Sequence, residues 1–339
     1  VHDEIFRDDD GNLIRQTNRS GGFEGGITTG EAIVVRAAMT IPRPGHADLT
    51  GAVKYGYREL RLSLERASAR ETAARVAVGA ICRQMLEALG ITIGSYVLSI
   101  GDVEADIPAG LTYSDRFNFA ESNDIRCPTA DALEPMRQRI RAIMEAKDTL
   151  GGVFEVVVLG APPGLGSHVH WDRRLDARLL WSMSSIHAVK GVELGPAFAN
   201  AARPGSEVHD EIFRDDDGNL IRQTNRSGGF EGGITTGEAI VVRAAMKPIS
   251  TVLNPRRSVD LASGSAAETV YERSDFCAVP RAAVVGEALA GITMAEAVKE
   301  KLGGDTMGEM RDRLATLRQA RLADLPMDNE PWRFGYETE

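Results

Sequence analysis

The sequence contains few of the residues that would point to a disulfide-rich or membrane-spanning protein. Only 3 of its 339 residues are cysteines, and these three (Cys82, Cys127 and Cys277) lie far apart. A disulfide framework or a cysteine-rich metal site is therefore not expected, and reduced thiols in a cytoplasmic protein fit better. The longest apolar runs, such as Val156–Leu159, are too short to cross a bilayer, so no transmembrane helix is predicted.

An excess of positive charge is also missing. The chain has 39 Lys and Arg residues against 49 Asp and Glu residues, a formal net charge of −10. This balance argues against general nucleic-acid binding, but it is compatible with a local basic pocket. The first twenty residues carry charges of both signs, so no secretory signal is expected.

An exact internal duplication is present. Val1–Met39 is identical, residue for residue, to Val208–Met246. Structural repeats normally diverge because each copy packs against different neighbours, so a perfect single copy favours a rearranged fragment over a functional tandem site. We therefore predict a duplicated fragment over residues 1–39, a core over residues 40–325 and an irregular tail over residues 326–339.

Hydrophobic periodicity predicts interleaved helices and strands. Ser68 and Glu71 form an S-x-x-E pattern that predicts a helix start, and the apolar face of this helix is expected to comprise Ala73, Ala77, Ala80, Ile81, Met85 and Ala88. Further helices are expected at 131–147, 175–183, 280–302 and 306–322, and strands at 91–100, 153–159 and 239–246. The order has no regular βαβ rhythm, and no G-x-G-x-x-G follows a strand, so the pattern favours an α+β fold.

Two segments have the chemistry of anion sites. Arg66, Ser68 and Arg70 lie at a helix start, where free backbone N–H groups attract anions, although these residues alone favour a capped helix with solvated arginines. The glycine-rich segment 232–237 leads to Lys247–Thr251, whose lysine and hydroxyls can hold phosphate or carbonyl oxygens. A glycine-rich hairpin is the alternative interpretation of that segment.

Two histidine segments are candidates for other chemistry. His46 lies in a Pro-Gly turn near Asp48 and Arg43, where a residue that titrates near neutrality can transfer a proton. His168, His170 and Asp172 could ligate a metal, and a metal-dependent hydrolase is therefore one candidate function. Because H-x-H alone is a weak signal, we predict no metal site.

Several motifs together resemble chorismate synthase. The matching segments, in the order of that family, are Arg43–Asp48, Arg66–Thr72, Ala188–Glu193, Gly232–Ile234, Lys247–Thr251 and Arg273–Cys277. The resemblance extends over about residues 42–322. It implies a β-α-β sandwich of antiparallel sheets around a helical layer, assembled as a homotetramer. It also implies a lyase that eliminates phosphate from 5-enolpyruvylshikimate 3-phosphate in a 1,4 sense, giving chorismate in the shikimate pathway of aromatic amino acid biosynthesis.

The resemblance also implies the site residues. Reduced FMN would be the cofactor, without net redox change, and NADPH would be needed only if the chain reduces its own flavin. His46 would protonate the reduced flavin, and Asp275 would assist proton movement at flavin N5. The residues that match flavin-lining positions are Arg66, Ala67, Ser68, His187, Ala188, Gly232, Lys247, Pro248, Ile249, Ser250, Thr251 and Arg273.

One departure from the family pattern leaves two functions open. Members of the family carry an N-terminal Glu-Ser-His-Gly motif, whose histidine is implied to protonate the departing phosphate, and an arginine-rich segment. Neither is found in this sequence, where the copy of 208–246 stands instead. The chain is therefore expected to be either a chorismate synthase or an inactive flavin- or phosphate-binding remnant.

Overall fold

The computed structural model describes residues 39–271, 274–325 and 327, together with four short strands within residues 5–28. The chain divides into two compact units, which are described separately. The smaller unit comprises Val1–Ala67 and Arg256–Thr269, and the larger comprises Ser68–Pro255 and Val270–Glu339.

The larger unit is built on a five-stranded antiparallel sheet of order β6-β5-β7-β13-β8. β13 pairs with β7 in a register that runs from Ile240 opposite Val158 to Met246 opposite Gly152. Valine and isoleucine dominate these strands because β-branched side chains pack well on a pleated surface. The strand bounds are β5 Thr92–Ile100, β6 Val103–Glu104, β7 Gly152–Leu159, β8 Val189–Leu194 and β13 Ile240–Met246.

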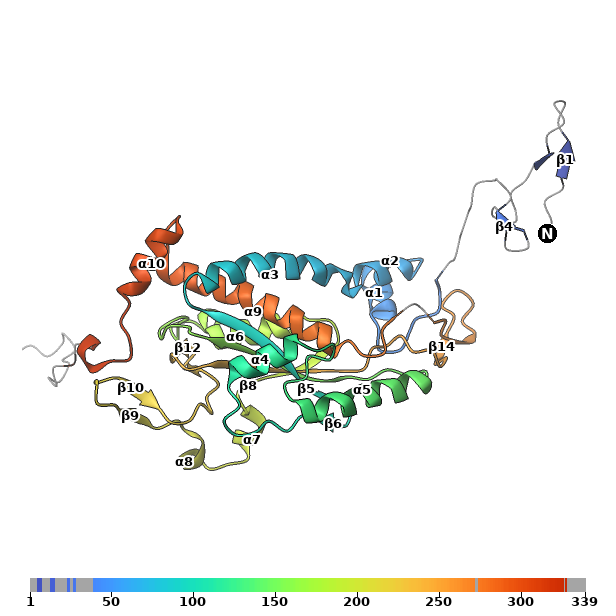
Figure 1. Cartoon of the computed structure of the whole chain (residues 1–339). Helices are drawn as coiled ribbons and strands as arrows, with labels where there is room; N and C mark the ends of the chain where they lie inside the picture. The colour runs from blue at the N-terminus through green and yellow to red at the C-terminus, as the bar shows by residue number, and fades with distance from the viewer. Residues whose placement is uncertain are drawn as a thin grey trace, which may run out of the picture. The chain divides into compact units, whose positions relative to one another are not determined.

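Helices cover the two faces of this sheet unequally. α9 (Val279–Leu302) packs on one face, with α3 (Thr72–Glu87) and α6 (Leu175–Ser184) beside it, and their buried side chains form the larger core with Phe154 and Val242. Figure 1 shows α3 and α9, which are far apart in the sequence, running side by side. α4 (Tyr113–Glu121) covers part of the opposite face, where its side chains form a smaller core with those of β5, β7 and β13.

The prediction of which side of α3 is buried is wrong. Ala73, Ala77, Ala80 and Ile81 are exposed, whereas Gly79 and Leu86 are buried. The reason is the close crossing with α9, where a Cβ built on Gly79 would lie 2.4 Å from the Cβ of Ala288. The side without bulky groups therefore faces the partner helix, and this overrides the periodicity of the larger residues.

A buried carboxylate links the sheet to its helices. Glu287, in the middle of α9, is 2% exposed. Its carboxylate accepts three hydrogen bonds, each at 2.6 Å, from Arg83 of α3, from Ser95 of β5 and from Arg126. Burial raises the pKa of Glu287, while the two guanidinium groups and the Ser95 hydroxyl oppose that rise. The cluster fixes the register of α9 against α3 and β5 because a buried charge needs all of its partners.

The remaining elements of the larger unit are short, apart from α5. They are η1 Ala69–Glu71, α5 Ala130–Glu145, η2 Trp171–Arg173, α7 Ala197–Ala201, α8 Gly205–Val208, β9 Ile212–Arg214, β10 Leu220–Arg222, β11 Phe230–Glu231, β12 Ile234–Thr235, α10 Met307–Ala315 and η3 Leu322–Asp324. The smaller unit contains β1 Ile5–Arg7, β2 Leu13–Arg15, β3 Phe23–Glu24, β4 Ile27–Thr28, α1 Asp48–Tyr55, α2 Arg61–Arg66, β14 Arg257–Val259 and β15 Ala266–Glu268.

The two copies of the duplicated sequence form the same hairpins. β1 pairs with β2 in the register in which β9 pairs with β10, since Phe6 lies opposite Ile14 and Phe213 opposite Ile221. The pairs β3–β4 and β11–β12 also match. Only the second copy has its following strand described, as β13. Residues 29–38, which carry the first copy of that strand, lie outside the described residues.

Most of the predicted elements are confirmed, and the fold is α+β as expected. α10 ends at Ala315, earlier than predicted, while α4 and β8 were not predicted from periodicity. Of the expected sandwich, the described residues contain one five-stranded sheet, and their other sheets have two strands each. In the described part of the chain, no helix combines the length and apolar character that crossing a membrane requires.

Candidate active site

His46 lies in a tight turn of the smaller unit. Gly45 has φ +75°, which a side chain would strain, and the backbone N–H of His46 donates to the Arg43 carbonyl at 3.3 Å. The turn leads into α1, which starts at Asp48. It therefore brings three side chains from one short loop, those of Arg43, His46 and Asp48, to the same place.

Asp48 is the centre of this cluster. Its carboxylate is fully buried, with Oδ1 2.7 Å from His46 Nδ1 and Oδ2 2.8 Å from Arg43 Nε. The backbone N–H of Arg43 also donates to Oδ2, at 3.1 Å. Burial acts to raise the pKa of Asp48, but the hydrogen bonds from His46 and Arg43 outweigh it and hold the pKa well below its usual range. The carboxylate is therefore ionised at neutral pH.

This geometry suits His46 for proton transfer. A carboxylate that accepts from Nδ1–H selects one tautomer, and Nε2, which lies 3.3 Å from Arg43 Nη2, is then the nitrogen that can exchange a proton. The His46 side chain is 21% exposed, whereas that of Asp48 is not exposed at all. Asp48 was not among the predicted site residues, although the His-x-Asp spacing after a Pro-Gly turn was the available signal.

Ser68 is the residue before η1 in the larger unit, and it follows Arg66, the last residue of α2, and Ala67 in the smaller unit. Ser68 Oγ accepts a hydrogen bond from the Arg70 N–H at 3.3 Å, so Ser68 caps η1, the short 3₁₀ helix before α3, and not the long helix α3 itself. The predicted reciprocal bond from Glu71 is not formed. The Glu71 carboxylate reaches forward along α3 to Arg75.

A turn after α6 connects two of the predicted flavin-lining segments. Ala188 has φ +65°, a left-handed conformation that is unusual for a residue with a side chain. Its carbonyl accepts a hydrogen bond from the Lys247 N–H at 2.9 Å, and β8 and β13 pair next to this point. His187 and Ala188 are thereby placed beside the start of the Lys247–Thr251 segment.

The Lys247–Thr251 segment is anchored by its backbone. The Thr149 hydroxyl donates to the Ile249 carbonyl at 2.7 Å. A Cβ on Gly151 would lie 2.2 Å from the Met246 carbonyl oxygen, so only glycine permits this approach. Burial lowers the pKa of Lys247, and the positive charge of Lys190 lowers it further.

This donor set fits a phosphorylated flavin. Two ammonium groups close enough to lower a pKa favour an anion near them, because the anion relieves both desolvation and repulsion. The hydroxyls of Ser68, Ser250 and Thr251 are of the kind that holds phosphate or carbonyl oxygens. The residues of the larger unit thus supply cations and hydroxyls of the right chemistry for FMN.

Gly232 is not brought to this place within one chain. It forms the β11–β12 turn, and the next residue, Gly233, accepts a hydrogen bond from Leu175 N–H at the start of α6. His187 and Lys247 follow the far ends of α6 and β13. With a rise of about 3.3 Å per strand residue, the two ends of β13 are roughly 20 Å apart.

Asp275 lies in the loop before α9. It forms an ion pair with Arg281, and the following residue, Phe276, accepts a hydrogen bond from Leu150 N–H at 2.8 Å. Burial raises the pKa of the neighbouring Cys277 thiol, which disfavours a reactive thiolate. Arg273 lies outside the described residues, and Asp275 and His46 belong to different units.

The histidines of the metal alternative lie around η2. His170 precedes this short helix, which contains Asp172. Among the side chains that the structure describes, no group of three or more His, Cys, Asp and Glu residues is placed to hold a metal ion.

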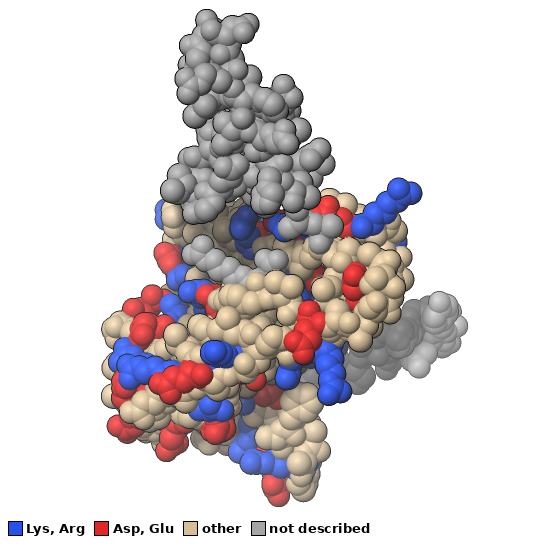
Figure 2. Space-filling model, turned by 90° about the vertical axis from the view of Figure 1, so that its right-hand side faces the viewer, with Lys and Arg blue, Asp and Glu red and all other residues tan. Residues whose placement is uncertain are grey.

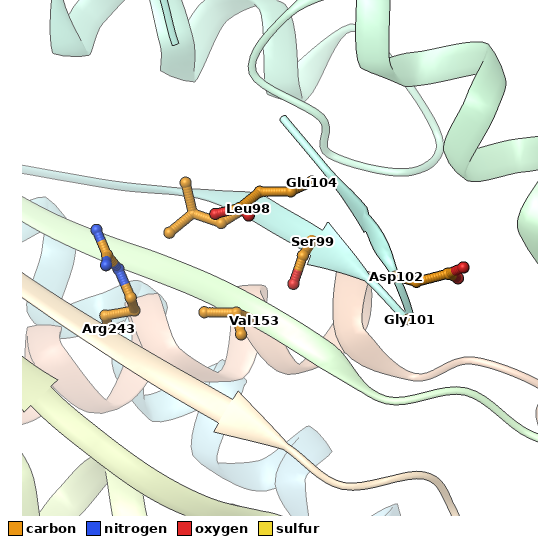
Figure 3. Close-up of a pocket in the computed structure, with 7 residues that line it drawn as sticks. All are labelled: Leu98, Ser99, Gly101, Asp102, Glu104, Val153 and Arg243. Atoms are coloured by element: carbon orange, nitrogen blue, oxygen red, sulfur yellow. The ribbon is translucent and has the colours of Figure 1, made fainter. Parts of the chain in front are cut away.

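A pocket of about 290 Å³ opens beside β5 and β6 on the sheet face that α9 does not cover. Figure 3 shows Arg243 on one side of it and Asp102 on the other. The Arg243 guanidinium pairs with Glu155 at 3.0 Å and Glu193 at 3.2 Å, so its charge is already balanced. None of the predicted site residues lines this pocket. The lining residues are Leu98, Ser99, Gly101, Asp102, Glu104, Val153 and Arg243.

Comparison with known proteins settles the family. Residues 36–298 match the family model described as chorismate synthase. The chain belongs to the chorismate synthase family. The chorismate synthase of Desulforamulus reducens is 47% identical over 321 residues, which cover 88% of this chain and 83% of that protein. The chorismate synthase of Syntrophotalea carbinolica is 53% identical over 285 residues, which cover 84% and 73% of the respective chains.

A solved structure supports the same assignment. A crystal structure of chorismate synthase is 46% identical to this chain, covers 79% of it, and superposes with a TM-score of 0.69. The predicted family, the α+β fold and the classification as a chorismate-forming lyase are confirmed. The catalytic and flavin-lining residues of this chorismate synthase family member remain predictions.

Proposed function

We propose that this chain catalyses the 1,4-elimination of phosphate from 5-enolpyruvylshikimate 3-phosphate to give chorismate, with reduced FMN as cofactor. The observation that carries the proposal is the His46–Asp48 pair, in which a buried ionised carboxylate holds Nδ1 at 2.7 Å. A histidine held in this way can transfer a proton through Nε2 at neutral pH.

The residues divide the work by their chemistry. When bound, reduced FMN supplies the electron-rich ring that supports loss of the allylic phosphate. His46 holds a proton at Nε2, oriented by Asp48, and Asp275 is the second proton-transfer group. Lys247 and Lys190, with the Ser250 and Thr251 hydroxyls, bind and orient phosphate and carbonyl oxygens. The fold holds these groups in position before the substrate reacts.

The assembly is proposed to be a homotetramer. Gly232 lies at the opposite end of β13 from Lys247, so we expect the two residues to contact different flavins. In the tetramer, Gly232 would therefore line the flavin of a neighbouring subunit. Light scattering coupled to size exclusion tests this assembly, and a monomer at micromolar concentration would contradict it.

Surface charge agrees with a small-molecule substrate. Figure 2 shows Lys and Arg side chains interspersed with Asp and Glu over the described part of the face that it draws. A mixed surface favours recognition in a local pocket over binding to an extended polyanion.

The decisive experiment measures chorismate formation by the purified chain with chemically reduced FMN. We expect turnover by the unmodified chain and a loss of roughly 10²- to 10⁴-fold in His46→Ala, the range typical of a general acid or base. His209→Ala, at a histidine outside the predicted site, is the control and should retain activity. FMN binding without turnover would instead identify the inactive remnant.

A further inference from the structure

A set of polar and charged side chains joins the start of α3 to the turn after α6. Arg75 Nε donates a hydrogen bond to Glu71 Oε2 at 3.0 Å, and Arg75 Nη2 lies 2.7 Å from Glu71 Oε1 in the same ion pair. Arg75 in turn donates through Nη1 to the Ser185 hydroxyl at 2.8 Å. Glu71 Oε1 also lies 3.6 Å from His187 Nδ1. We call Glu71, Arg75, Ser185 and His187 the 71–187 clamp.

The clamp acts on a turn that needs external support. Ala188 is held at φ +65°, a conformation that costs about 1 kcal/mol for a residue with a side chain and persists only when its surroundings fix it. The Ala188 carbonyl also receives the Lys247 N–H. A shift of Ser185 or His187 would therefore be transmitted to Ala188 and to the first residue of the Lys247–Thr251 segment.

The contacts and the partial burial of Glu71 and Arg75 indicate that this ion pair positions the turn after α6 and is more than a surface ion pair. The fork of Arg75 engages both oxygens of Glu71, which restrains the two side chains more strongly than a single contact does. Each of Glu71, Arg75 and His187 is only about 30% exposed or less. The clamp thus joins two segments that are more than 100 residues apart in the sequence and that both contain predicted flavin-lining residues.

We propose that Glu71 and Arg75 are positioning residues of the flavin site. They act through Ser185 and His187, which they hold at a fixed distance from the Ser68–Arg70 helix start. This inference rests on the proposed flavin-dependent function, because it assigns a task to residues that surround the proposed FMN site.

The test measures FMN binding to the full chain by quenching of flavin fluorescence, together with the visible absorption spectrum of the bound flavin. Glu71→Gln removes the carboxylate charge that pairs with Arg75 beside His187. We expect a Kd about five- to tenfold higher and a changed spectrum of bound FMN, because the ring would then meet a displaced turn. The melting temperature should change no more than in the control.

The matched control is Glu87→Gln, which removes another carboxylate at an i,i+4 spacing from an arginine of α3. Glu87 lies 3.9 Å from Arg83, and its side chain is 51% exposed. This variant should bind FMN with unchanged affinity and an unchanged spectrum. An equal loss of affinity in both variants would overturn the proposal, because it would indicate general electrostatics of the helix.

A double-mutant cycle supplies the second criterion. If Glu71 acts through Ser185, Glu71→Gln and Ser185→Ala should weaken binding together by less than the product of their separate effects. Independent effects, or normal binding by Glu71→Gln, would overturn the clamp and leave the proposed function intact. Failure of the unmodified chain to bind FMN would overturn the proposed flavin site, and the clamp with it.

Discussion

At the residue scale, Asp48 shows how a buried carboxylate can serve both stability and chemistry. It neutralises Arg43, whose side chain is 6% exposed, and holds one imidazole nitrogen of His46. Removing one partner of a buried ion pair leaves the other charge without compensation. The residue that orients the proposed proton donor is therefore also one on which the smaller unit depends.

Replacing Asp48 should change how the free energy of unfolding depends on pH. The pKa of Asp48 is below its ordinary value of 3.8 in the folded chain, so its contribution to stability is present above pH 3.8 and declines as the pH falls toward the folded pKa. We expect Asp48→Asn to lower the free energy of unfolding by about 3 kcal/mol at pH 7. The difference from the unmodified chain should shrink below about pH 4, by up to ~1.4 kcal/mol per pH unit.

Urea unfolding at several pH values measures both quantities. Ser63→Ala is the control, because the Ser63 hydroxyl donates to the Ala47 carbonyl at 2.8 Å and supports the same loop without a titratable group. Its effect should not vary with pH. A difference between the unmodified chain and Asp48→Asn that is constant from pH 7 to pH 3 would contradict the assigned role of the carboxylate.

At the element scale, the contact between α3 and α9 determines which side of α3 is buried. Gly79 allows the backbone of α9 to approach at Ala288, and Gly291 contributes to the same crossing, since a Cβ there would lie 3.3 Å from the Gly79 carbonyl oxygen. Small residues thus define the interface, and the larger apolar residues Val78 and Ile81 stay exposed. The buried face of α3 is therefore determined by where the two helix backbones can approach closely, and not by the position of the largest hydrophobic side chains.

A pair of glycine substitutions tests this packing. In a free helix, alanine is about 1 kcal/mol more favourable than glycine. At Gly79 the new methyl group would lie 2.4–2.7 Å from three atoms of Ala288, so Gly79→Ala should instead destabilise the chain, by about 1–3 kcal/mol. Chemical denaturation gives the value.

Gly308, in α10, provides the matched case. The nearest atom to its added Cβ would be Thr306 Oγ1, at 3.8 Å, which is an ordinary contact. Gly308→Ala should therefore leave stability unchanged or slightly increase it. If Gly79→Ala were as harmless as Gly308→Ala, the close crossing of α3 and α9 would be wrong.

At the scale of the whole molecule, the duplicated sequence separates local from tertiary determinants. Hairpins β1–β2 and β9–β10 have the same register because their turns and cross-strand pairs are encoded within a few residues. β13 is different, because it lies between β7 and β8 and needs both neighbours. The larger sheet provides one position between those two strands, and the second copy occupies it.

We therefore predict that the two copies differ in amide exchange. Exchange in residues 33–39 should be faster than in 240–246, because residues 240–246 pair with strands on both sides and the sheet has one position between β7 and β8. Mass spectrometry can distinguish the copies through peptides that include Thr40 or Lys247, the residues where the sequences diverge. Strong, equal protection in both copies would instead support a true tandem element.

The family, the α+β class and most elements of the larger unit could be predicted from the sequence, because hydrophobic periodicity, glycine turns and motif spacing are local properties. The strand Ile240–Met246 is an example. The site was less accessible. Asp48 could be suspected from its spacing to His46, but its burial and charge became apparent only in the folded loop.

The arrangements that depend on distant residues could not be predicted from local patterns and are seen first in the folded chain. The buried face of α3, the separation of Gly232 from Lys247 and the contact of Arg75 with Ser185 each join segments far apart in the chain. Side-chain periodicity carries no information about which helix crosses at which residue, or which end of a strand a turn reaches. These relations are set by close packing and by the pairing of buried polar groups, which involve the whole fold at once.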